Sequence, residues 1–294
     1  MLPPALVPVV NAALHEAGEE TPVRSFESVK GGYTSTSLRI RTRRAVYLLK
    51  WSGHHSYVAE ARGLEAIGRA GALRVPRVLA AADATDDRPG FLLQEWVATK
   101  PGWTRDMNRK LGAQLAALHH AGTAAPGFGS VRRLYAGGAV EPAGWLPDWP
   151  SCFREHFLRP AIERAERAGA LPPALAPGLD RLCARLADWL GGDGPPALIH
   201  GDLWRNNVLC DTRGEPVLID PAAAYADREL ELTYTALWGS FSPSFVQAYQ
   251  EVWPSPPGLS DRRELYKLFF LLQRADHPNE LGPVAATVRW FVGE

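Results

Sequence analysis

This chain of 294 residues has few cysteines, and it lacks the patterns of a signal peptide and of a membrane span. Its three cysteines, Cys152, Cys183 and Cys210, are an odd number without a close pair, and they fit neither a disulfide framework nor the spacing of zinc ligands. The apolar segment 1–10 lacks a basic start and contains prolines, unlike a signal peptide. No apolar run has the length of a membrane span. We expect a cytoplasmic protein that does not bind a membrane.

An excess of charge of either sign is also missing. The 32 lysines and arginines balance 32 aspartates and glutamates, so no overall field attracts nucleic acid or an anionic membrane. What the chain does have is a hydrophobic content of 46%, which can fill a sizeable core at this length. These properties favour a globular protein, expected to be a monomer, that acts on a small molecule and not on nucleic acid.

The first part of the chain has the pattern of a small antiparallel sheet with one main helix. Short apolar runs between turn residues predict strands, and apolar residues at three-residue steps predict a helix. The expected elements are a short helix at 5–17, strands at 24–29, 37–41 and 45–50, a helix at 57–70, and strands at 75–79 and 91–97. We expect them to form an N-terminal nucleotide-binding lobe at residues 1–98, followed by a hinge at 99–102.

The remainder of the chain has a mostly helical pattern. The expected elements are a helix from about Met107 that ends at Gly122, helices at 151–168 and 174–190, a short strand at 197–199, and four helices after Asp227. We expect a larger C-terminal lobe at residues 99–294, which carries the catalytic loop and the substrate site. The fold class is therefore α+β, with two lobes.

The segment from His200 to Asn207, with the sequence His-Gly-Asp-Leu-Trp-Arg-Asn-Asn, has the composition of a phosphotransferase centre. Phosphoryl transfer requires a carboxylate to orient the attacking hydroxyl, and oxygen ligands to hold magnesium beside the phosphates. Asp202 is the candidate catalytic base, because a carboxylate on this loop could accept the proton of the hydroxyl. The tripeptide His-Gly-Asp alone could equally cap a helix, so the prediction depends on the residues that follow.

The metal ligands are predicted from a hairpin. Two short apolar runs, 208–210 and 217–219, are joined by a turn that contains glycine. In an antiparallel hairpin the start of one strand lies beside the end of the other, so Asn207 and Asp220 should be neighbours. Magnesium prefers oxygen ligands and often uses one or two protein groups together with substrate phosphates. We therefore predict that Asn207 and Asp220 bind Mg²⁺.

Lys50 ends the third predicted strand and is the candidate cation for the ATP phosphates. Such a lysine needs a carboxylate partner on the following helix. Glu60 is the preferred partner and Glu65 the competitor, although either glutamate could simply belong to a solvated helix face. We predict a pair of Lys50 and Glu60 that helps to bind ATP.

Two further segments are candidates for binding ATP. The chain has no Walker motif of the Gly-x-x-x-x-Gly-Lys-[Ser/Thr] type, so the phosphates would have to be covered by a flap instead. Gly31 and Gly32 would let backbone approach the phosphates, but they could also form a plain hairpin turn. Glu95, Trp96 and Val97 lead into the hinge and could contact adenine, or they could end a core strand.

The histidines show no pattern of a metal site. His54, His55, His119 and His120 are interpreted as surface or packing residues. His200 is expected to brace the catalytic loop through hydrogen bonds and not to perform acid/base chemistry.

The chain resembles fructosamine kinases, also called ketosamine 3-kinases, over nearly its whole length. The resemblance is carried by Gly31-Gly32, Glu60-Ala61-Arg62-Gly63-Leu64, Val75-Pro76-Arg77-Val78, His200-Gly201-Asp202-Leu203-Trp204, Ile219-Asp220-Pro221-Ala222, Leu237-Trp238-Gly239-Ser240-Phe241-Ser242 with Phe245 and Ala248-Tyr249, and Leu265-Tyr266-Lys267-Leu268. Trp204 and the Pro-Ala pair after Asp220 distinguish this family from aminoglycoside and choline kinases, which share the other motif residues.

The resemblance implies a protein-kinase-like bilobal fold and the ATP-dependent phosphorylation of a sugar hydroxyl at the 3-position of a glycated amine. The sugar could be that of a ribulosamine, erythrulosamine or fructosamine, and the amine could be free or protein-bound. Trp204, Arg205 and Trp238 are the candidate substrate residues. Arg205-Asn206 replaces the Ser-Gly that the family usually has after the tryptophan, and the segment 273–278 also departs from the family pattern. Both departures could change specificity.

Two other functions stay open from the sequence. The first is a small-molecule kinase of the same fold that phosphorylates an aminoglycoside, choline or homoserine-like alcohol. The second is a non-catalytic ATP-binding relative, although every candidate base and metal position is intact.

Overall fold

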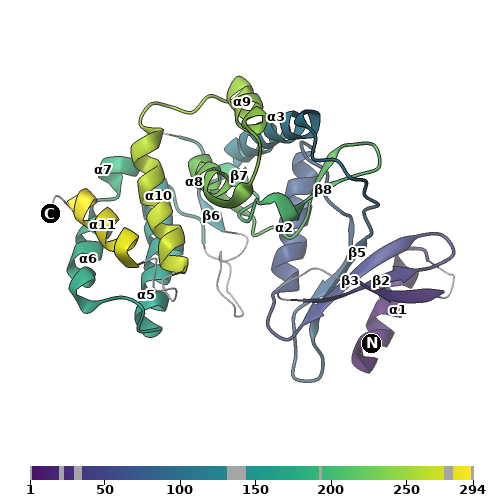
Figure 1. Cartoon of the computed structure of the whole chain (residues 1–294). Coiled ribbons are helices and arrows are strands. Elements are labelled where there is room, and N and C mark those ends of the chain that lie inside the picture. Colours follow the sequence, from purple (N-terminus) through teal and green to yellow (C-terminus); the bar gives the residue numbers. More distant parts are fainter. Residues whose placement is uncertain are drawn as a thin grey trace.

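The computed structural model describes residues 2–19, 23–29, 35–130, 144–191, 194–274 and 281–292. A sheet with the N terminus beside it forms one end of the molecule, and helices around the C terminus form the other (Figure 1). No helix among the described residues is long and apolar enough to cross a membrane.

The sheet end contains a five-stranded antiparallel sheet with the strand order β1-β2-β3-β5-β4. Its strands are β1 (Ser25–Ser28), β2 (Thr36–Arg41), β3 (Val46–Ser52), β4 (Val78–Ala82) and β5 (Gly90–Glu95). The strand predicted at 75–79 is therefore wrong at its start, since β4 begins at Val78. Pro76 lacks the N–H group that a ladder position needs, and the strand forms only beyond it.

Helices cover both faces of this sheet. Helix α1 (Val7–Glu16), preceded by a 3₁₀ turn at Pro4–Leu6, shares an apolar core with Leu49 and Leu93. Helix α2 (Tyr57–Ala70) packs with Leu92. Successive residues of a strand point to opposite faces, so Lys50, next to Leu49 in β3, faces the side of α2.

Helix α2 has the boundaries predicted from the sequence. The Ser56 side chain accepts a hydrogen bond from the Ala59 N–H at its start, and Gly71 ends it in the left-handed conformation, with φ 70°. Gly63, in the middle of the helix, lies against Pro221 and Ala223. A Cβ atom there would come within 3.2 Å of side-chain atoms of both residues, so α2 packs closely on the segment that follows Asp220.

The helical end of the molecule is built from nine named helices among the described residues. They are α3 (Arg105–Ala121), α4 (Trp149–Cys152), α5 (Arg159–Arg167), α6 (Ala176–Ala184), α7 (Ala187–Leu190), α8 (Arg228–Tyr234), α9 (Pro243–Val252), α10 (Leu259–Gln273) and α11 (Leu281–Val292). Short 3₁₀ turns occur at Gly122–Ala124, Pro173–Leu175 and Arg205–Asn207, and π-helical segments at Phe153–Leu158 and Thr235–Gly239.

Two predicted helices differ from the structure. The helix expected at 151–168 begins at Trp149 and contains the π-helical segment Phe153–Leu158. The helix expected at 174–190 is broken near Arg185, which has φ −110° and ends α6. The four helices expected after Asp227 are present, and α8 is continued by the π-helical segment Thr235–Gly239.

Two small sheets lie beside these helices. One contains β6 (Gly129–Ser130), β10 (Ala224–Ala226) and β7 (Ala197–Ile199), of which only β7 was predicted. The other is the predicted hairpin of β8 (Val208–Cys210) and β9 (Pro216–Leu218). A buried cluster that includes Leu203, Val208 and Leu218 together with residues of α3 and α9 packs against this region.

Candidate active site

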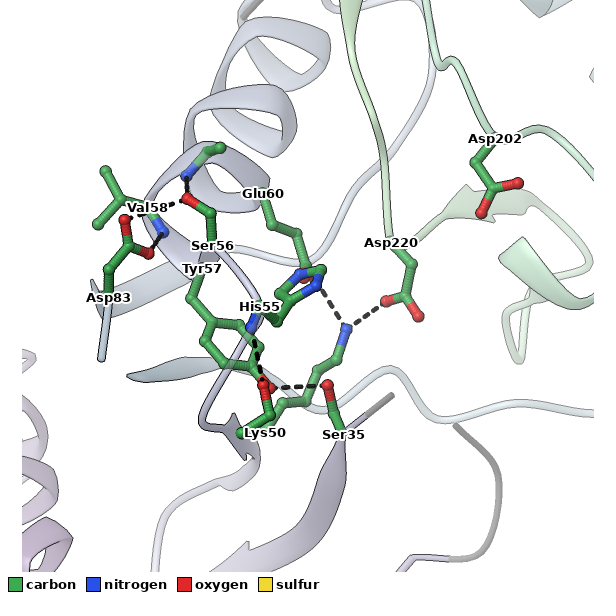
Figure 2. A network of polar contacts seen from close by, with 12 residues as sticks. Ser35, Lys50, His55, Ser56, Tyr57, Val58, Glu60, Asp83, Asp202 and Asp220 are labelled. Carbon is green, nitrogen blue, oxygen red and sulfur yellow. Dashed lines mark hydrogen bonds and ion pairs between the residues drawn. The ribbon is translucent and has the colours of Figure 1, made fainter. Parts of the chain in front are cut away.

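Lys50 stands between two carboxylates that come from distant parts of the chain. Its Nζ atom lies 2.8 Å from Glu60 Oε1 of α2 and 2.5 Å from Asp220 Oδ1, which follows β9 (Figure 2). Burial acts to lower the pKa of Lys50, but Glu60 and Asp220 outweigh it and raise the pKa above its usual value. The lysine therefore stays charged, and it links the sheet to the segment after the hairpin.

Glu60 is the partner that the sequence analysis preferred for Lys50. The side chain of Glu65, the competitor, is exposed and lies near Arg69 on the same helix. Burial acts to raise the pKa of Glu60, but Lys50 and His55 lower it to about 2. Glu60 is thus a buried carboxylate that remains ionised.

His55 makes the second contact of Glu60. Its Nε2 lies 2.7 Å from Glu60 Oε2, so the two oxygens of this carboxylate contact two different side chains. The His55 ring also packs on Tyr57, with 4.6 Å between ring centroids, so the expected packing role is present and the contact with Glu60 comes in addition to it. Its position just before the helix cap gave no hint of the contact, which depends on how the loop folds back over α2.

Tyr57 connects this cluster to Ser35, just before β2. Its hydroxyl donates a hydrogen bond to Ser35 Oγ at 2.7 Å, at the point where the described chain resumes before β2 (Figure 2). Gly31 and Gly32 lie outside the described residues, so their contact with phosphates stays a prediction.

Asn207 and Asp220 are neighbours, as the hairpin predicted. Val208 pairs with Leu218, and the next backbone hydrogen bond runs from the Ile219 N–H to the Asn207 carbonyl at 3.0 Å. Asp220 has a φ of 56°, in the left-handed region that few non-glycine residues adopt. A strained backbone of this kind is often found at functional sites.

The amide of Asn207 is oriented by Asp202. Its Nδ2 donates to the Asp202 carbonyl oxygen at 2.9 Å and to Asp202 Oδ2 at 3.0 Å. Because Nδ2 is used in these two bonds, Oδ1 of the Asn207 amide is the atom suited to bind a metal. The described residues contain no group of three or more His, Cys, Asp or Glu that could hold a metal. This donor set of one amide and one carboxylate fits Mg²⁺ that arrives with a nucleotide.

The loop that carries Asp202 is braced by His200, as predicted. His200 Nε2 lies 2.9 Å from the Ile219 carbonyl, and the Asp202 N–H donates to His200 Nδ1 at 3.2 Å. In this arrangement Nε2 donates a hydrogen bond and Nδ1 accepts one. The histidine therefore ties the loop to the residue before Asp220.

Two residues that no sequence motif indicates, Tyr234 and Glu231, hold the same loop. The Tyr234 hydroxyl donates to Asp202 Oδ1 at 2.6 Å, and Glu231 accepts hydrogen bonds from the backbone N–H groups of His200 and Gly201. Burial raises the pKa of Asp202 above its usual value, against the opposing effects of Tyr234, His200 and Asn207. Asp202 is therefore a better proton acceptor than an exposed aspartate.

Glu95 and Trp96, which lead into the hinge, make hydrogen bonds within the protein. The Glu95 carboxylate pairs with Arg74 and accepts a hydrogen bond from the Arg77 N–H. The Glu95 N–H donates to the Arg77 carbonyl and the Trp96 N–H to the Val46 carbonyl, so these two N–H groups are not free to bind adenine. Binding of adenine by Glu95, Trp96 and Val97 stays a prediction, and it would depend on their other backbone atoms.

The candidate substrate residues occupy different surroundings. The ring of Trp238 packs against Tyr234 and Phe270, with centroid distances of 5.3 and 5.5 Å, so it lies in the aromatic cluster next to the tyrosine that contacts Asp202. Trp204 is half-buried and precedes the 3₁₀ turn at Arg205–Asn207. The Arg205 guanidinium lies over Trp103, 4.9 Å from the ring centroid. Their contact with a substrate stays a prediction.

The fold is that of small-molecule kinases. The solved structure of aminoglycoside phosphotransferase APH(4)-Ia matches 96% of this chain and 98% of that chain in a thermostable apo form, with a TM-score of 0.62 and 18% identity. A putative fructosamine-3-kinase from Thermobifida fusca is more similar, with a TM-score of 0.79 and 29% identity over 97% of this chain and 99% of that chain. These matches confirm the predicted α+β, kinase-like fold.

Sequence comparison identifies the family. The fructosamine kinase family matches residues 8–280. A probable ketoamine kinase of Lactiplantibacillus plantarum is 34% identical over 86% of this chain and 88% of its own length. A chloroplastic protein-ribulosamine 3-kinase of Oryza sativa subsp. japonica is 29% identical over 90% of this chain and 76% of its own length. The chain belongs to the fructosamine kinase family, as its motifs indicated.

Proposed function

We propose that this protein is an ATP-dependent ketosamine kinase, which phosphorylates the 3-hydroxyl of the sugar in a glycated amine and so serves deglycation repair. The observation that carries the proposal is the convergence of Lys50, Asp202, Asn207 and Asp220 at one site in a member of the fructosamine kinase family. Ribulosamine, erythrulosamine and fructosamine adducts are the candidate acceptors, on a small molecule or on a protein. The lobe at residues 1–98 would bind the nucleotide, and the lobe at 99–294 would bind the acceptor.

Lys50, Asn207 and Asp220 would hold the nucleotide and its metal. Asn207 and Asp220 offer the oxygen ligands for Mg²⁺, which when bound neutralises charge on the phosphates. Lys50 contacts both carboxylates. Its ammonium group can therefore exchange the contact with Asp220 for one with the phosphates and keep the contact with Glu60. Gly31, Gly32 and the hinge residues Glu95, Trp96 and Val97 would complete the nucleotide site.

Asp202 would act as the base. Its carboxylate lies beside the metal residue Asn207 and has a raised pKa, which suits a group that has to accept a proton. In the reaction the sugar hydroxyl loses its proton to Asp202 and forms a bond to the γ-phosphorus, while the bond from that phosphorus to the bridging oxygen of ATP breaks and ADP leaves. Trp204, Arg205 and Trp238 would line the acceptor side.

The test combines product analysis with a variant. The wild-type protein is incubated with Mg-ATP and ribulosamine, erythrulosamine or fructosamine adducts, and the products are analysed by ³¹P NMR and mass spectrometry for a sugar 3-phosphate. We expect Asp202→Asn to lower kcat by about 10²- to 10⁴-fold and to keep Mg-ATP binding, measured as a shift in thermal unfolding.

Aminoglycosides and choline serve as competing acceptors in the same assay. Phosphorylation of these alcohols without any ketosamine phosphate would refute the proposal, and so would an Asp202→Asn variant that is as active as the wild type. Light scattering in the same buffer checks the expected monomer.

A further inference from the structure

One face of helix α8 contacts the catalytic loop at two points. Glu231 and Tyr234 are three residues apart in this helix, and residues at that spacing lie on the same face. Glu231 accepts hydrogen bonds from the N–H groups of His200 at 3.1 Å and Gly201 at 2.6 Å, and Tyr234 donates one to the Asp202 carboxylate at 2.6 Å. The helix therefore fixes both the backbone at the start of the loop and the side chain of its candidate base.

The first contact point is rigid. Glu231 is buried, and its Oε2 lies 2.8 Å from His119 Nε2, while His119 Nδ1 lies 2.8 Å from the hydroxyl of Tyr249. Such a chain of buried hydrogen bonds leaves the glutamate little freedom to move. The backbone of the loop is thus held in a fixed position relative to α8.

The second contact point is positioned by aromatic packing. The Tyr234 ring lies 5.3 Å from the centroids of both Trp238 and Phe270. Tyr234 is also the last residue of α8 before the π-helical segment Thr235–Gly239, and π-helical turns are frequent at functional sites. The ring is held from the side, and its hydroxyl points at Asp202.

The carboxylate of Asp202 is engaged through both oxygens. Oδ1 accepts from Tyr234, and Oδ2 accepts from Asn207 Nδ2 at 3.0 Å. Two hydrogen bonds on opposite oxygens fix the plane of the carboxylate, whereas one would let it rotate about its terminal torsion. A carboxylate oxygen has more than one lone pair, so Asp202 can still accept a hydrogen bond from a substrate hydroxyl.

We propose that Tyr234 is a positioning residue that holds the plane of the Asp202 carboxylate for the phosphoryl-transfer step. The proposal rests on the proposed kinase function. The tyrosine keeps its own proton throughout, and the proton of the sugar hydroxyl passes to Asp202. Tyr234 itself is therefore not a catalytic residue, and its contribution should be to the turnover step and not to the binding of ATP.

The main experiment compares two tyrosine hydroxyls. Tyr234→Phe removes the hydroxyl that contacts Asp202 but keeps the ring in its aromatic cluster. Tyr266→Phe is the matched control, because it removes another buried hydroxyl that donates to an aspartate, Asp227, at 2.8 Å. Asp227 caps the start of α8 through the Glu229 N–H, so the control also tests a general loosening of this helix.

We expect Tyr234→Phe to lower kcat roughly 10- to 100-fold, as expected for the loss of a hydrogen bond to a charged group and of its orientation. Its KM for Mg-ATP should stay within about twofold, because the hydrogen bond that this variant loses goes to Asp202. Tyr266→Phe should unfold at a lower temperature than the wild type and keep its kcat. A kcat of Tyr234→Phe within twofold of the wild type, or an equal loss of kcat in Tyr266→Phe, would overturn the proposal.

The readouts separate this proposal from the proposed function. Turnover is followed both as sugar phosphate and as ADP release, with and without the acceptor. A wild-type protein that releases ADP without forming a ketosamine phosphate would overturn the proposed function, and the Tyr234→Phe and Tyr266→Phe variants would then be compared by ADP release. If neither variant differs from the wild type there, the positioning role is overturned as well.

Discussion

Glu60 and Asp202 lie on opposite sides of Asp220 in Figure 2, and their surroundings differ in charge. Glu60 is buried between the Lys50 ammonium and the His55 ring, and its pKa is lowered to about 2. Asp202 accepts hydrogen bonds from the Tyr234 hydroxyl and the Asn207 amide, which are neutral, and burial raises its pKa. One carboxylate is built to stay charged, and the other can take up a proton.

From this difference we expect separate tasks for the two sides of the site. Groups whose surroundings push their pKa values apart are the usual sign of an acid/base pair or of a division between binding and chemistry. Here the charged cluster around Lys50 suits the binding of phosphates, and the neutral donors around Asp202 suit a proton acceptor. The two sides should therefore respond differently to substitution.

The largest difference is expected between Lys50→Met and Asp202→Asn. Both should abolish most turnover. Lys50→Met leaves Glu60 buried without its ammonium partner and should lower the free energy of unfolding by about 3–5 kcal/mol, measured by urea denaturation at pH 7. Asp202→Asn removes a carboxylate whose charged form burial disfavours, so its stability should equal or exceed that of the wild type. Equal losses of stability in the two variants would abolish the contrast.

The second prediction concerns the pH dependence of the Glu60 contribution. The folded pKa of Glu60, about 2, is below the usual 4.5, so its ionised form favours the folded state. Its contribution is fully present above pH 4.5 and is lost as the pH falls towards 2. We expect Glu60→Gln to be less stable than the wild type by about 2–3 kcal/mol at pH 7, with a difference that shrinks below pH 4.5.

Urea denaturation of Glu60→Gln and the wild type at several pH values between 7 and 3 measures this trend. Glu65→Gln, on the exposed face of the same helix, is the control and should show no comparable difference at any pH. A stability difference of Glu60→Gln that does not depend on pH would contradict the assignment of Glu60 as a permanently charged group.

The smallest effect is expected for His55→Gln. The histidine ring contacts Glu60 Oε2, and a single hydrogen bond of this kind contributes about 1 kcal/mol. The variant should raise the KM for Mg-ATP a few-fold and leave kcat nearly unchanged, because Glu60 keeps Lys50. His54→Gln, next to it but exposed, should behave as the wild type. A lowered kcat with an unchanged KM would instead mean that His55 contributes to the turnover step and not to the binding of Mg-ATP.

The contacts on the side of Lys50 were predictable from the sequence, because the residues that form each contact belong to the same element or to neighbouring elements. Lys50 lies in β3, two residues before its end at Ser52, where successive side chains point to opposite faces of the sheet, and Glu60 is buried on the next helix. The neighbourhood of Asn207 and Asp220 follows from the geometry of one hairpin. Each of these inferences needed a single element or a pair of adjacent ones.

The neutral side was only partly predictable. Asp202 is visible in a motif, but Tyr234 and Glu231 reach it from a helix far along the chain, and nothing in their spacing relates them to the loop. The strands β6 and β10 are two and three residues long, too short to carry an alternating pattern. Such contacts are decided by tertiary packing, which a local pattern does not encode.

The close packing of Gly63 on Pro221 and Ala223 has a consequence for how the activity can be controlled. Glu60 lies one turn before this glycine, and Asp220 directly precedes Pro221, so the contact joins the helix of one to the backbone of the other. Enzymes switched by the outward swing of a helix need an interface that opens and recloses. In this protein an outward movement of α2 would have to separate Gly63 from the side chains of Pro221 and Ala223 that pack on it. Control of the activity by such a swing would therefore disturb both carboxylates that contact Lys50.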